Sequence, residues 1–233
     1  MKAVILAGGL GIRLRPFTEA IPKPLLPIGE KAMLEIQIQN LAHYGFDKVY
    51  VATNYKADYI ESFIGDGRRL GVSIKFSKED KPLGTCGPLY LLKEDLTEPF
   101  ILMNGDILTR INFRKLYDFG ESQPSHLTVV TTEIQTPFNF GRIESSNGLI
   151  ISIEEKPPMV TEILAGIYYF KPPIFQHIPE NEYFGIDDLI KKMLSLSRPV
   201  SRYLMHEYWL DIGRLDDFNE AQVAYEKHFK ESQ

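Results

Sequence analysis

The chain has 233 residues, of which 44% are hydrophobic and 24% are charged, and its formal net charge is −5. This composition is typical of a globular protein that can bury a sizeable apolar core, and the acidic balance argues against a nucleic-acid surface. No apolar run reaches the length of a membrane span, and the single cysteine, Cys86, excludes an internal disulfide and is expected to be a small packed thiol. We therefore expect a cytoplasmic protein without a nucleic-acid or membrane partner.

The first half of the chain alternates short apolar runs with helical patterns. Short apolar runs predict buried strands, and apolar residues at helical spacing that stop near glycine predict helices. The predicted strands are residues 2–7, 48–53, 73–78 and 100–103, and the predicted helices are residues 31–44, 58–64 and 88–96. This alternation predicts an α/β fold with a Rossmann-like, doubly wound, mostly parallel sheet. Ligands of such sheets bind beyond the carboxyl ends of the strands.

The pattern changes after about residue 112. Residues 126–134 and 162–171 are predicted strands, and residues 141–144 and 149–154 are predicted to form a hairpin. A helix is expected at 186–196, a strand at 200–211 and a terminal amphipathic helix at 215–229. No linker, repeat or low-complexity tract separates the two halves. We expect one domain over residues 1–233, with the hairpin region and the C-terminal helix added to the sheet.

The loop after the first predicted strand is rich in glycine and basic residues. Gly8, Gly9 and Gly11 free the backbone, so that successive N–H groups can point at phosphate oxygens. Arg13 and Lys23 then supply positive charge. A dinucleotide fingerprint would need a third glycine further on, and a P-loop would end in Gly-Lys-Ser/Thr, and neither is present. The loop is therefore predicted to bind phosphate in another way.

Two carboxylates follow predicted strands. Asp106 ends the string Asn-Gly-Asp, and Asp211 is followed by Ile and Gly. Mg²⁺ commonly takes one or two carboxylates together with the phosphate oxygens of a substrate. Asp106 and Asp211 are therefore candidate Mg²⁺ ligands.

Several strings together resemble the sugar-1-phosphate nucleotidylyltransferase family. These strings are GGLGIRLRP at 8–16, PKP at 22–24, EKP at 155–157 and WLDIG at 209–213, and the resemblance runs from Lys2 to about Tyr225. It implies Mg²⁺-dependent transfer of a nucleotidyl group from a nucleoside triphosphate to a sugar 1-phosphate, with release of pyrophosphate. It also implies a nucleotide-binding half at residues 1–111 and a sugar-phosphate-binding half, with the C-terminal helix, at 112–233.

The resemblance assigns roles to single residues. Arg13 and Lys23 are the implied catalytic residues, with Arg13 balancing the leaving pyrophosphate and Lys23 reaching the α-phosphate. Lys156 is implied to hold the sugar phosphate and Glu155 a sugar hydroxyl. The implied nucleotide-binding residues are Leu6, Ala7, Gly8, Gly9, Gly11, Arg13, Lys23, Glu79, Gly84 and Asp106. The implied sugar-phosphate-binding residues are Gly141, Glu155, Lys156 and Gly166, and the implied metal ligands are Asp106 and Asp211.

Glu79 bears on the choice of base, because by resemblance it faces the Watson–Crick edge of the nucleotide. Relatives that use UTP or dTTP commonly carry glutamine there. A carboxylate only accepts hydrogen bonds, and guanine offers two adjacent donors where uracil offers one between two carbonyls. The string PLGTCGP at 82–88 also resembles the branch of mannose-, heptose- and glucosamine-1-phosphate guanylyltransferases. We expect GTP as the donor, with a UTP- or dTTP-using enzyme as the alternative.

Two other classes stay open. A catalytically silent regulatory paralogue would typically have lost a metal aspartate or the loop arginine, whereas Arg13, Asp106 and Asp211 are all retained. A glycosyltransferase with the same sheet would carry an Asp-x-Asp motif, of which only the second acid is present at Asp106. The identity of the sugar and the oligomeric state, including a homodimer, are also left open.

Overall fold

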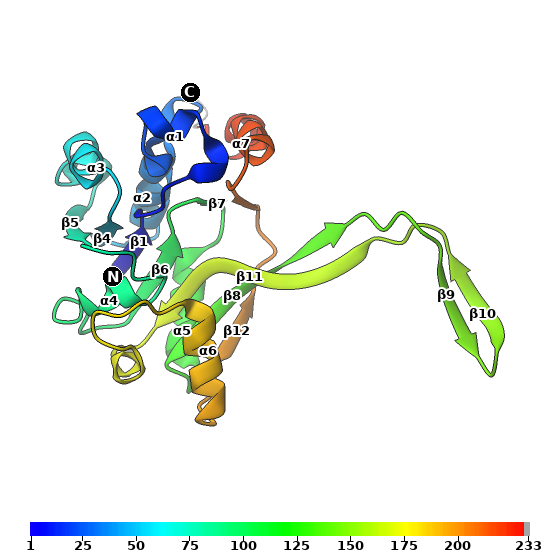
Figure 1. The fold of residues 1–233 in the computed structure, drawn as a ribbon. Helices are drawn as coiled ribbons and strands as arrows, with labels where there is room; N and C mark the ends of the chain where they lie inside the picture. Colours follow the sequence, from blue (N-terminus) through cyan, green and yellow to red (C-terminus); the bar gives the residue numbers. More distant parts are fainter. Residues whose placement is uncertain (231–233) are drawn as a thin grey trace.

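The computed structural model describes residues 1–230 and is built around a seven-stranded sheet with the strand order β12-β8-β11-β6-β1-β4-β5 (Figure 1). The strands are β1 Lys2–Leu6, β4 Lys48–Thr53, β5 Ser73–Lys78, β6 Phe100–Asn104, β8 Leu127–Thr136, β11 Met159–Phe170 and β12 Ser201–Leu204. β11 is antiparallel to β6 and β8, and the other neighbouring pairs are parallel. The predicted mostly parallel sheet is therefore confirmed.

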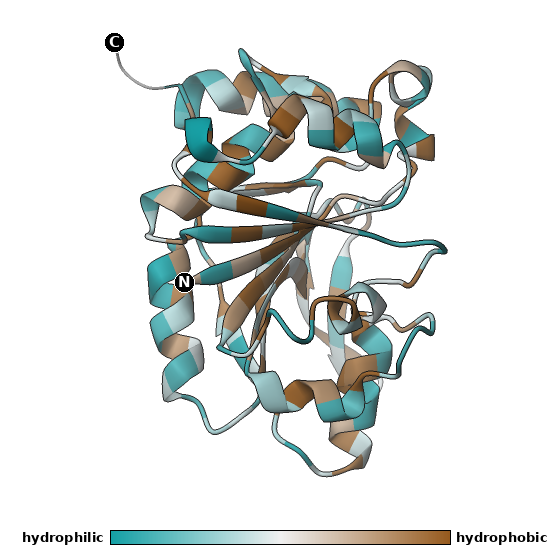
Figure 2. Cartoon of the chain, turned by 90° about the vertical axis from the view of Figure 1, so that its left-hand side faces the viewer, coloured by the Kyte–Doolittle hydropathy of each residue, from teal (hydrophilic) through white to brown (hydrophobic). Residues whose placement is uncertain are grey.

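Helices cover both faces of this sheet. The helices of the described chain are α1 Phe17–Ala20, α2 Met33–His43, α3 Ala57–Ile64, α4 Gly87–Tyr90, α5 Phe113–Ser122, α6 Ile186–Ser195 and α7 Leu215–His228, of which α2 to α6 cover the sheet. One apolar core joins the sheet to α2, α3 and α5, and a second core joins its other face to α4 and α6. The longer helices carry both hydrophobic and hydrophilic turns, as expected for helices with one face on a sheet (Figure 2). The layers are those of a doubly wound α/β fold.

The first strand lies in the middle of the sheet because both of its faces are apolar. Ala3 and Ile5 belong to the first core and Val4 to the second, and all three are fully buried. A near-continuous apolar run is the pattern of a parallel strand that is covered on both sides. The chain passes from β1 to β4 and β5 on one side and later adds β6 on the other. The crevice between the ends of β1 and β6 is therefore the topological switch point, where ligands of such sheets bind.

Three two-stranded sheets accompany the central one. They are β2 Pro27–Ile28 with β3 Lys31–Ala32, β7 Ile107–Thr109 with β13 Trp209–Asp211, and β9 Arg142–Ser146 with β10 Leu149–Glu154. A third apolar core packs α7 against β2, β7 and β13, through Tyr225, Leu108 and Leu210 among others. Four short 3₁₀ helices complete the described chain: η1 Ile12–Leu14, η2 Lys23–Leu25, η3 Arg68–Leu70 and η4 Pro172–His177.

One part of the chain leaves the body. β8 and β11 continue past the central sheet as a two-stranded ribbon, which leads into the hairpin of β9 and β10 (Figure 1). We call residues 133–164 the arm. The predicted hairpin is thus confirmed, and β11 begins at Met159 rather than at the predicted residue 162.

Two predicted elements are corrected. The helix predicted at 88–96 ends at Tyr90, and the chain continues to Leu96 as hydrogen-bonded turns. The single strand predicted at 200–211 divides into β12 and β13, because the chain leaves the edge of the main sheet after Leu204. The Arg110 N–H donates to the Tyr208 carbonyl at 3.0 Å, which directs the second piece onto β7. Alternating apolar residues do not distinguish one long strand from two short ones in different sheets.

Helix α5 was not predicted. Its N-cap is Asn112, whose side-chain oxygen accepts from the Lys115 N–H at 2.9 Å. Phe113, Leu116 and Gly120 are the buried residues of α5 and recur at helical spacing. A glycine inside the helix obscured this signal. Gly120 is required there because a Cβ at this position would lie 2.2 Å from the ring of Tyr169.

Candidate active site

A cavity of about 750 Å³ opens at the carboxyl ends of β1 and β6. It brings together residues that are far apart in the sequence. Its walls are formed by Leu6, Gly8, Gly9, Leu10, Gly11, Ile12, Arg13, Lys23, Pro24, Asn54, Glu79, Pro82, Leu83, Gly84, Asn104, Gly105, Asp106, Tyr183 and Gly213. All the predicted nucleotide-binding residues except Ala7 line this cavity, and Ala7 lies buried behind it, where its N–H donates to the Ala52 carbonyl at 2.7 Å.

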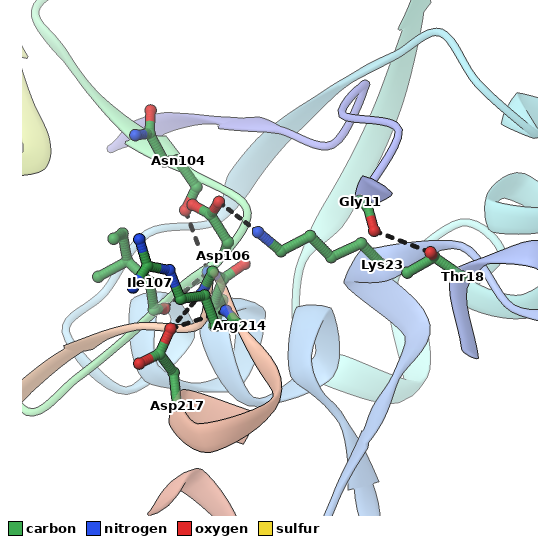
Figure 3. Close-up of polar contacts among 10 residues, drawn as sticks. Gly11, Thr18, Lys23, Asn104, Asp106, Ile107, Arg214 and Asp217 are labelled. Carbon is green, nitrogen blue, oxygen red and sulfur yellow. Dashed lines mark hydrogen bonds and ion pairs between the residues drawn. The ribbon is translucent and has the colours of Figure 1, made fainter. Parts of the chain in front are cut away.

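The glycine loop is tightly constrained. Gly11 has a φ of 61°, and a Cβ there would lie 2.7 Å from Cγ2 of Thr18. The Thr18 hydroxyl donates to the Gly11 carbonyl at 2.8 Å (Figure 3). A Cβ at Gly8 would meet Asn54 at 3.2 Å and the Glu79 Oε1 atom at 3.3 Å. Glycine at these positions lets the backbone of the loop pack closely on Thr18, Asn54 and Glu79, and leaves no side chain between the loop backbone and a ligand.

A partly buried ion pair lines the cavity. The Lys23 Nζ donates to the Asp106 Oδ2 at 2.6 Å, and only 10% of the Lys23 side chain is exposed (Figure 3). Pro22 and Pro24 flank the lysine and restrict its backbone. A Cβ at Gly105 would lie 2.3 Å from the Leu6 carbonyl oxygen, so only glycine fits between β1 and Asp106. The predicted Asn-Gly-Asp and Pro-Lys-Pro strings therefore meet in one place.

The second predicted aspartate lies beside the first. β13 pairs antiparallel with β7, with Asp211 opposite Ile107, and the Ile212 N–H donates to the Asp106 carbonyl at 2.9 Å. Asp211 is exposed and is not among the residues that line the cavity, yet the protein around it removes part of its hydration. This desolvation, followed by the negative charge of Asp106, raises the pKa of Asp211 above its usual value, and Lys23 opposes the shift.

Arg13 is supported from the C-terminal part of the chain. A Cβ at Gly213 would lie 3.3 Å from each terminal nitrogen of the Arg13 guanidinium group, so the cation rests against this glycine. The Asp217 carboxylate accepts from the N–H groups of Gly213 and Arg214 at 3.0 and 2.7 Å (Figure 3). Sequence reasoning did not find Asp217, although two acidic residues in the first turn of a helical pattern are a signal for such an N-terminal cap. Its role is to hold the turn against which Arg13 packs.

Glu79 follows β5 and is half-buried at the far end of the cavity. Its backbone N–H donates to the Thr53 carbonyl at 2.9 Å, and its Oε2 accepts from the Leu83 N–H at 3.0 Å. Burial raises the pKa of Glu79, and the Leu83 N–H opposes this rise. Gly84 has a φ of 78° and packs on Phe184, whose carbonyl oxygen would lie 2.8 Å from a Cβ. The loop from Glu79 to Gly84 is therefore fixed by its backbone contacts.

The predicted sugar-phosphate residues are divided between two places. Gly166, with a φ of 70°, lies against Asn104 at the cavity, where a Cβ would be 2.8 Å from the amide nitrogen. Gly141, Glu155 and Lys156 lie on the arm. The Lys156 Nζ is 3.9 Å from Glu155 Oε1, and the two side chains are 62% and 71% exposed. The structure thus gathers these arm residues with one another, away from the cavity walls (Figure 1).

The single cysteine lies apart from the cavity walls. Cys86 is fully buried, and burial raises the pKa of its thiol far above the usual range, as expected for a packed thiol. Among residues 1–230, no three His, Cys, Asp or Glu side chains are grouped so that they could hold a metal by themselves. In the same part of the chain, no helix has the length and apolar character needed to cross a bilayer.

Comparison with known proteins decides the family. The family model described as nucleotidyl transferase matches residues 2–228. The chain belongs to this family. This nucleotidyl transferase is 33% identical to the mannose-1-phosphate guanylyltransferase catalytic subunit beta of Dictyostelium discoideum, over 100% of this chain and 67% of that protein. It is 32% identical to a UTP–glucose-1-phosphate uridylyltransferase of Synechocystis, over 95% of this chain and 62% of that protein.

Solved structures agree with this assignment. A putative glucose-1-phosphate thymidylyltransferase from Bacillus anthracis superposes with a TM-score of 0.81 at 26% identity, over 100% of this nucleotidyl transferase and 98% of that chain. HddC from Yersinia pseudotuberculosis superposes with a TM-score of 0.75 at 27% identity, over 96% and 99% of the two chains. The predicted resemblance to the sugar-1-phosphate nucleotidylyltransferases is confirmed. The chain spans about two thirds of the length of the two sequence relatives.

Proposed function

We propose that this protein transfers a nucleotidyl group, with GTP as the favoured donor, to a sugar 1-phosphate. The observation that carries the proposal is the partly buried ion pair of Lys23 and Asp106, which lies beside the glycine loop at the switch point of the sheet. Both substrates are anions, so the catalyst must neutralise charge and hold the reactants in line. Membership of the nucleotidyl transferase family supports this reaction.

In the proposed reaction, an oxygen of the acceptor phosphate forms a bond to the α-phosphorus of the nucleotide. The bond from the α-phosphorus to the bridging oxygen breaks, and pyrophosphate leaves with the electron pair. The N–H groups of the glycine loop and the Arg13 guanidinium group would bind the triphosphate. Lys23, which faces the cavity, would stabilise the charge that develops at the α-phosphate.

We also propose that Asp106 and Asp211 hold Mg²⁺. Asp106 lies in the turn between β6 and β7, and Asp211 ends β13, which pairs with β7. The charge of Asp106 helps to raise the pKa of Asp211, so the pair would favour a cation between them. When bound, Mg²⁺ would neutralise phosphate charge and orient the phosphates for in-line attack. With two carboxylates, most of the coordination would fall to phosphate oxygens and water.

Glu79 supports GTP as the donor. Its Oε1 faces the backbone of Gly8 on the cavity wall. Its Oε2 accepts from the Leu83 N–H and has a second lone pair that can accept another hydrogen bond. The carboxylate can therefore accept from the two adjacent donors of guanine. Named relatives at 33% identity are mannose-1-phosphate guanylyltransferases, and HddC has a structure complexed with GMP-PN.

A UTP- or dTTP-using enzyme is the second candidate. It is favoured by the uridylyltransferase of Synechocystis and by the structural match to a putative thymidylyltransferase. The two candidates share the same reaction and differ in which nucleotide base the cavity binds near Glu79.

The test is pyrophosphate release by the purified protein with a panel of nucleoside triphosphates and sugar 1-phosphates, including mannose 1-phosphate, with and without Mg²⁺. We expect Mg²⁺-dependent release that is fastest with GTP. Faster release with UTP or dTTP would support the second candidate. Binding of nucleotide without release from any pair would instead support a silent regulatory protein.

A further inference from the structure

The arm exposes an unusual amount of its surface. Every residue from 139 to 156 is exposed, and the hairpin of β9 and β10 pairs only with itself. In the outer part of the ribbon, Met159–Leu164 pairs with residues 131–136. Beyond Thr131, which still pairs with Leu204 of β12, neither edge of this ribbon pairs with a further strand among the described residues. A two-stranded ribbon alone is marginally stable in water, and its open edges and faces favour association. The arm therefore needs a partner surface.

The hairpin has one apolar face. Ile153 is opposite Ile143, and Ile150 is opposite Ser145. Since paired residues and residues two apart share a face, Ile143, Ile150 and Ile153 project from the same side. The other side carries Arg142 and Glu154, whose side chains form an ion pair at 2.5 Å. Both sides are exposed to solvent, and the side with Ile143, Ile150 and Ile153 offers a cluster of apolar side chains there.

The apolar surface of the arm matches what one protein contributes to a stable interface. Its apolar side chains that are more than half exposed are Phe140, Ile143, Leu149, Ile150, Ile151, Ile153, Met159 and Val160. Full burial of such a side chain removes on the order of 60–120 Å² of apolar surface. Since these side chains are between 54% and 72% exposed, the set still offers roughly 300–600 Å². A standard interface buries about 800 Å² per partner, of which somewhat more than half is apolar, or about 450 Å².

We propose that a second copy of this chain covers the arm, and that the two copies exchange arms so that Glu155 and Lys156 of each arm complete the cavity of the other. A two-fold axis brings the same apolar face of both copies together, which gives a closed dimer without a further partner. The exchange supplies the cavity with the acceptor residues that its own body does not provide. This inference rests on the proposed function, because that function assigns Lys156 to the acceptor phosphate.

The geometry of the ribbon favours exchange over closure on the same chain. Met159 to Leu164 pair with Thr136 to Thr131 in unbroken register. A continuous ladder over this length keeps the ribbon directed away from the cavity of its own body (Figure 1). The residues between ribbon and hairpin, 137–141 and 155–158, form no strand pairs and can orient the hairpin on a partner.

The decisive experiment mixes two impaired variants of the full chain, assayed at a sugar 1-phosphate concentration well below the raised KM of Lys156→Ala. Lys156→Ala removes the proposed acceptor-binding cation of the arm and leaves the cavity intact. Asp106→Asn removes a carboxylate of the cavity and leaves the arm intact. If arms are exchanged, a mixed dimer has one intact site, made from the cavity of the first variant and the arm of the second. After equal amounts of the two are unfolded and refolded together, we expect about a quarter of wild-type pyrophosphate release, because half of the dimers are mixed and each has one of two sites intact. If the mixture is no more active than the two variants separately, exchange is wrong.

A second experiment tests the surface itself. Ile153→Lys places a charge on the apolar face, and Ser152→Lys places the same charge on the opposite face as a matched control. Sedimentation velocity should find a dimer for the wild type and for Ser152→Lys, and mostly monomer for Ile153→Lys. Circular dichroism should find all three folded, since both positions are exposed. A monomeric wild type, or a dimer that Ile153→Lys leaves intact, would overturn the proposed interface.

The two proposals fail in different ways. If the proposed function is wrong, the wild type itself releases no pyrophosphate from any substrate pair, whatever its oligomeric state. If the exchange is wrong, the wild type is active but the mixed variants do not complement each other.

Discussion

The cavity and the arm are built in opposite ways. At the cavity, Lys23 is almost fully buried, Arg13 is packed on Gly213, and Glu79 is held by the Leu83 N–H. On the arm, Lys156 is exposed, and among residues 1–230 its one ion-pair partner is Glu155, at 3.9 Å. A charged side chain that is held in place before the ligand arrives loses little conformational freedom on binding, whereas an exposed lysine loses much of it. The charged groups of the cavity are therefore preorganised, whereas those of the arm are not.

The largest expected effect is at the cavity. Asp106→Asn and Asp211→Asn should each lower kcat by about 10²–10³-fold, because a group that stabilises transition-state charge is lost from a fixed site. Steady-state rates at several Mg²⁺ concentrations measure this. Asp58→Asn is the control, since Asp58 is an exposed carboxylate on α3. A variant that keeps wild-type turnover at limiting Mg²⁺ would mean that the two aspartates do not hold the metal.

The next largest effect is expected on the arm, where a substitution should change the binding of one substrate more than the other. Lys156→Ala should raise KM for the sugar 1-phosphate by about 10–100-fold, the effect expected when a charged hydrogen bond is lost, and change KM for the nucleotide much less. Arg142→Ala removes another arm cation and is the matched control. If both variants raise KM for both substrates equally, the arm does not act on the acceptor alone.

A smaller effect is expected at the base end. Glu79→Gln should lower the ratio of kcat/KM for GTP over UTP by about tenfold, because a neutral amide accepts more weakly than a carboxylate. Asp80→Asn changes the exposed neighbouring carboxylate and should leave the ratio unchanged. Equal ratios in the wild type and Glu79→Gln would show that another group selects the base.

The smallest expected effect is on stability. Burial raises the pKa of Glu79, so the folded state prefers its protonated form. The stabilisation this provides is complete below the unfolded pKa and is lost as pH rises through the higher folded pKa. Urea unfolding from pH 4 to 7 should therefore find Glu79→Gln gaining stability relative to the wild type as pH rises. The opposite slope would mean that the Glu79 carboxylate is favoured in the folded state.

The same contrast explains what the sequence could predict. The glycine loop, Lys23 and Asp106 were predictable because each lies in a short string whose conformation is set locally, by glycine at positions that exclude a Cβ and by proline beside Lys23. The position of Lys156 was not predictable, because it depends on where two long strands carry their hairpin. A pattern of alternating residues fixes the pairing of strands but not the direction in which the ribbon points.

Supporting residues were harder to predict than those that face the cavity. Asp217 acts only through the turn at Gly213, and its contact with Arg13 is indirect. Helix α5 was hidden because Gly120, which lowers helix propensity, is needed for the close contact with Tyr169. In both cases a contact with a residue far away in the sequence decides the residue type. The neighbouring residues in the sequence therefore do not predict this contact.

The contact between Arg13 and Gly213 has a consequence for how the protein is made. Arg13 leaves the ribosome early, and Gly213 leaves it only after every strand of the main sheet has been synthesised. During synthesis the glycine loop therefore lacks the surface that holds its arginine, even when β1, β4 and β5 have already paired. A nascent chain therefore cannot hold Arg13 in its final place until translation has passed Gly213.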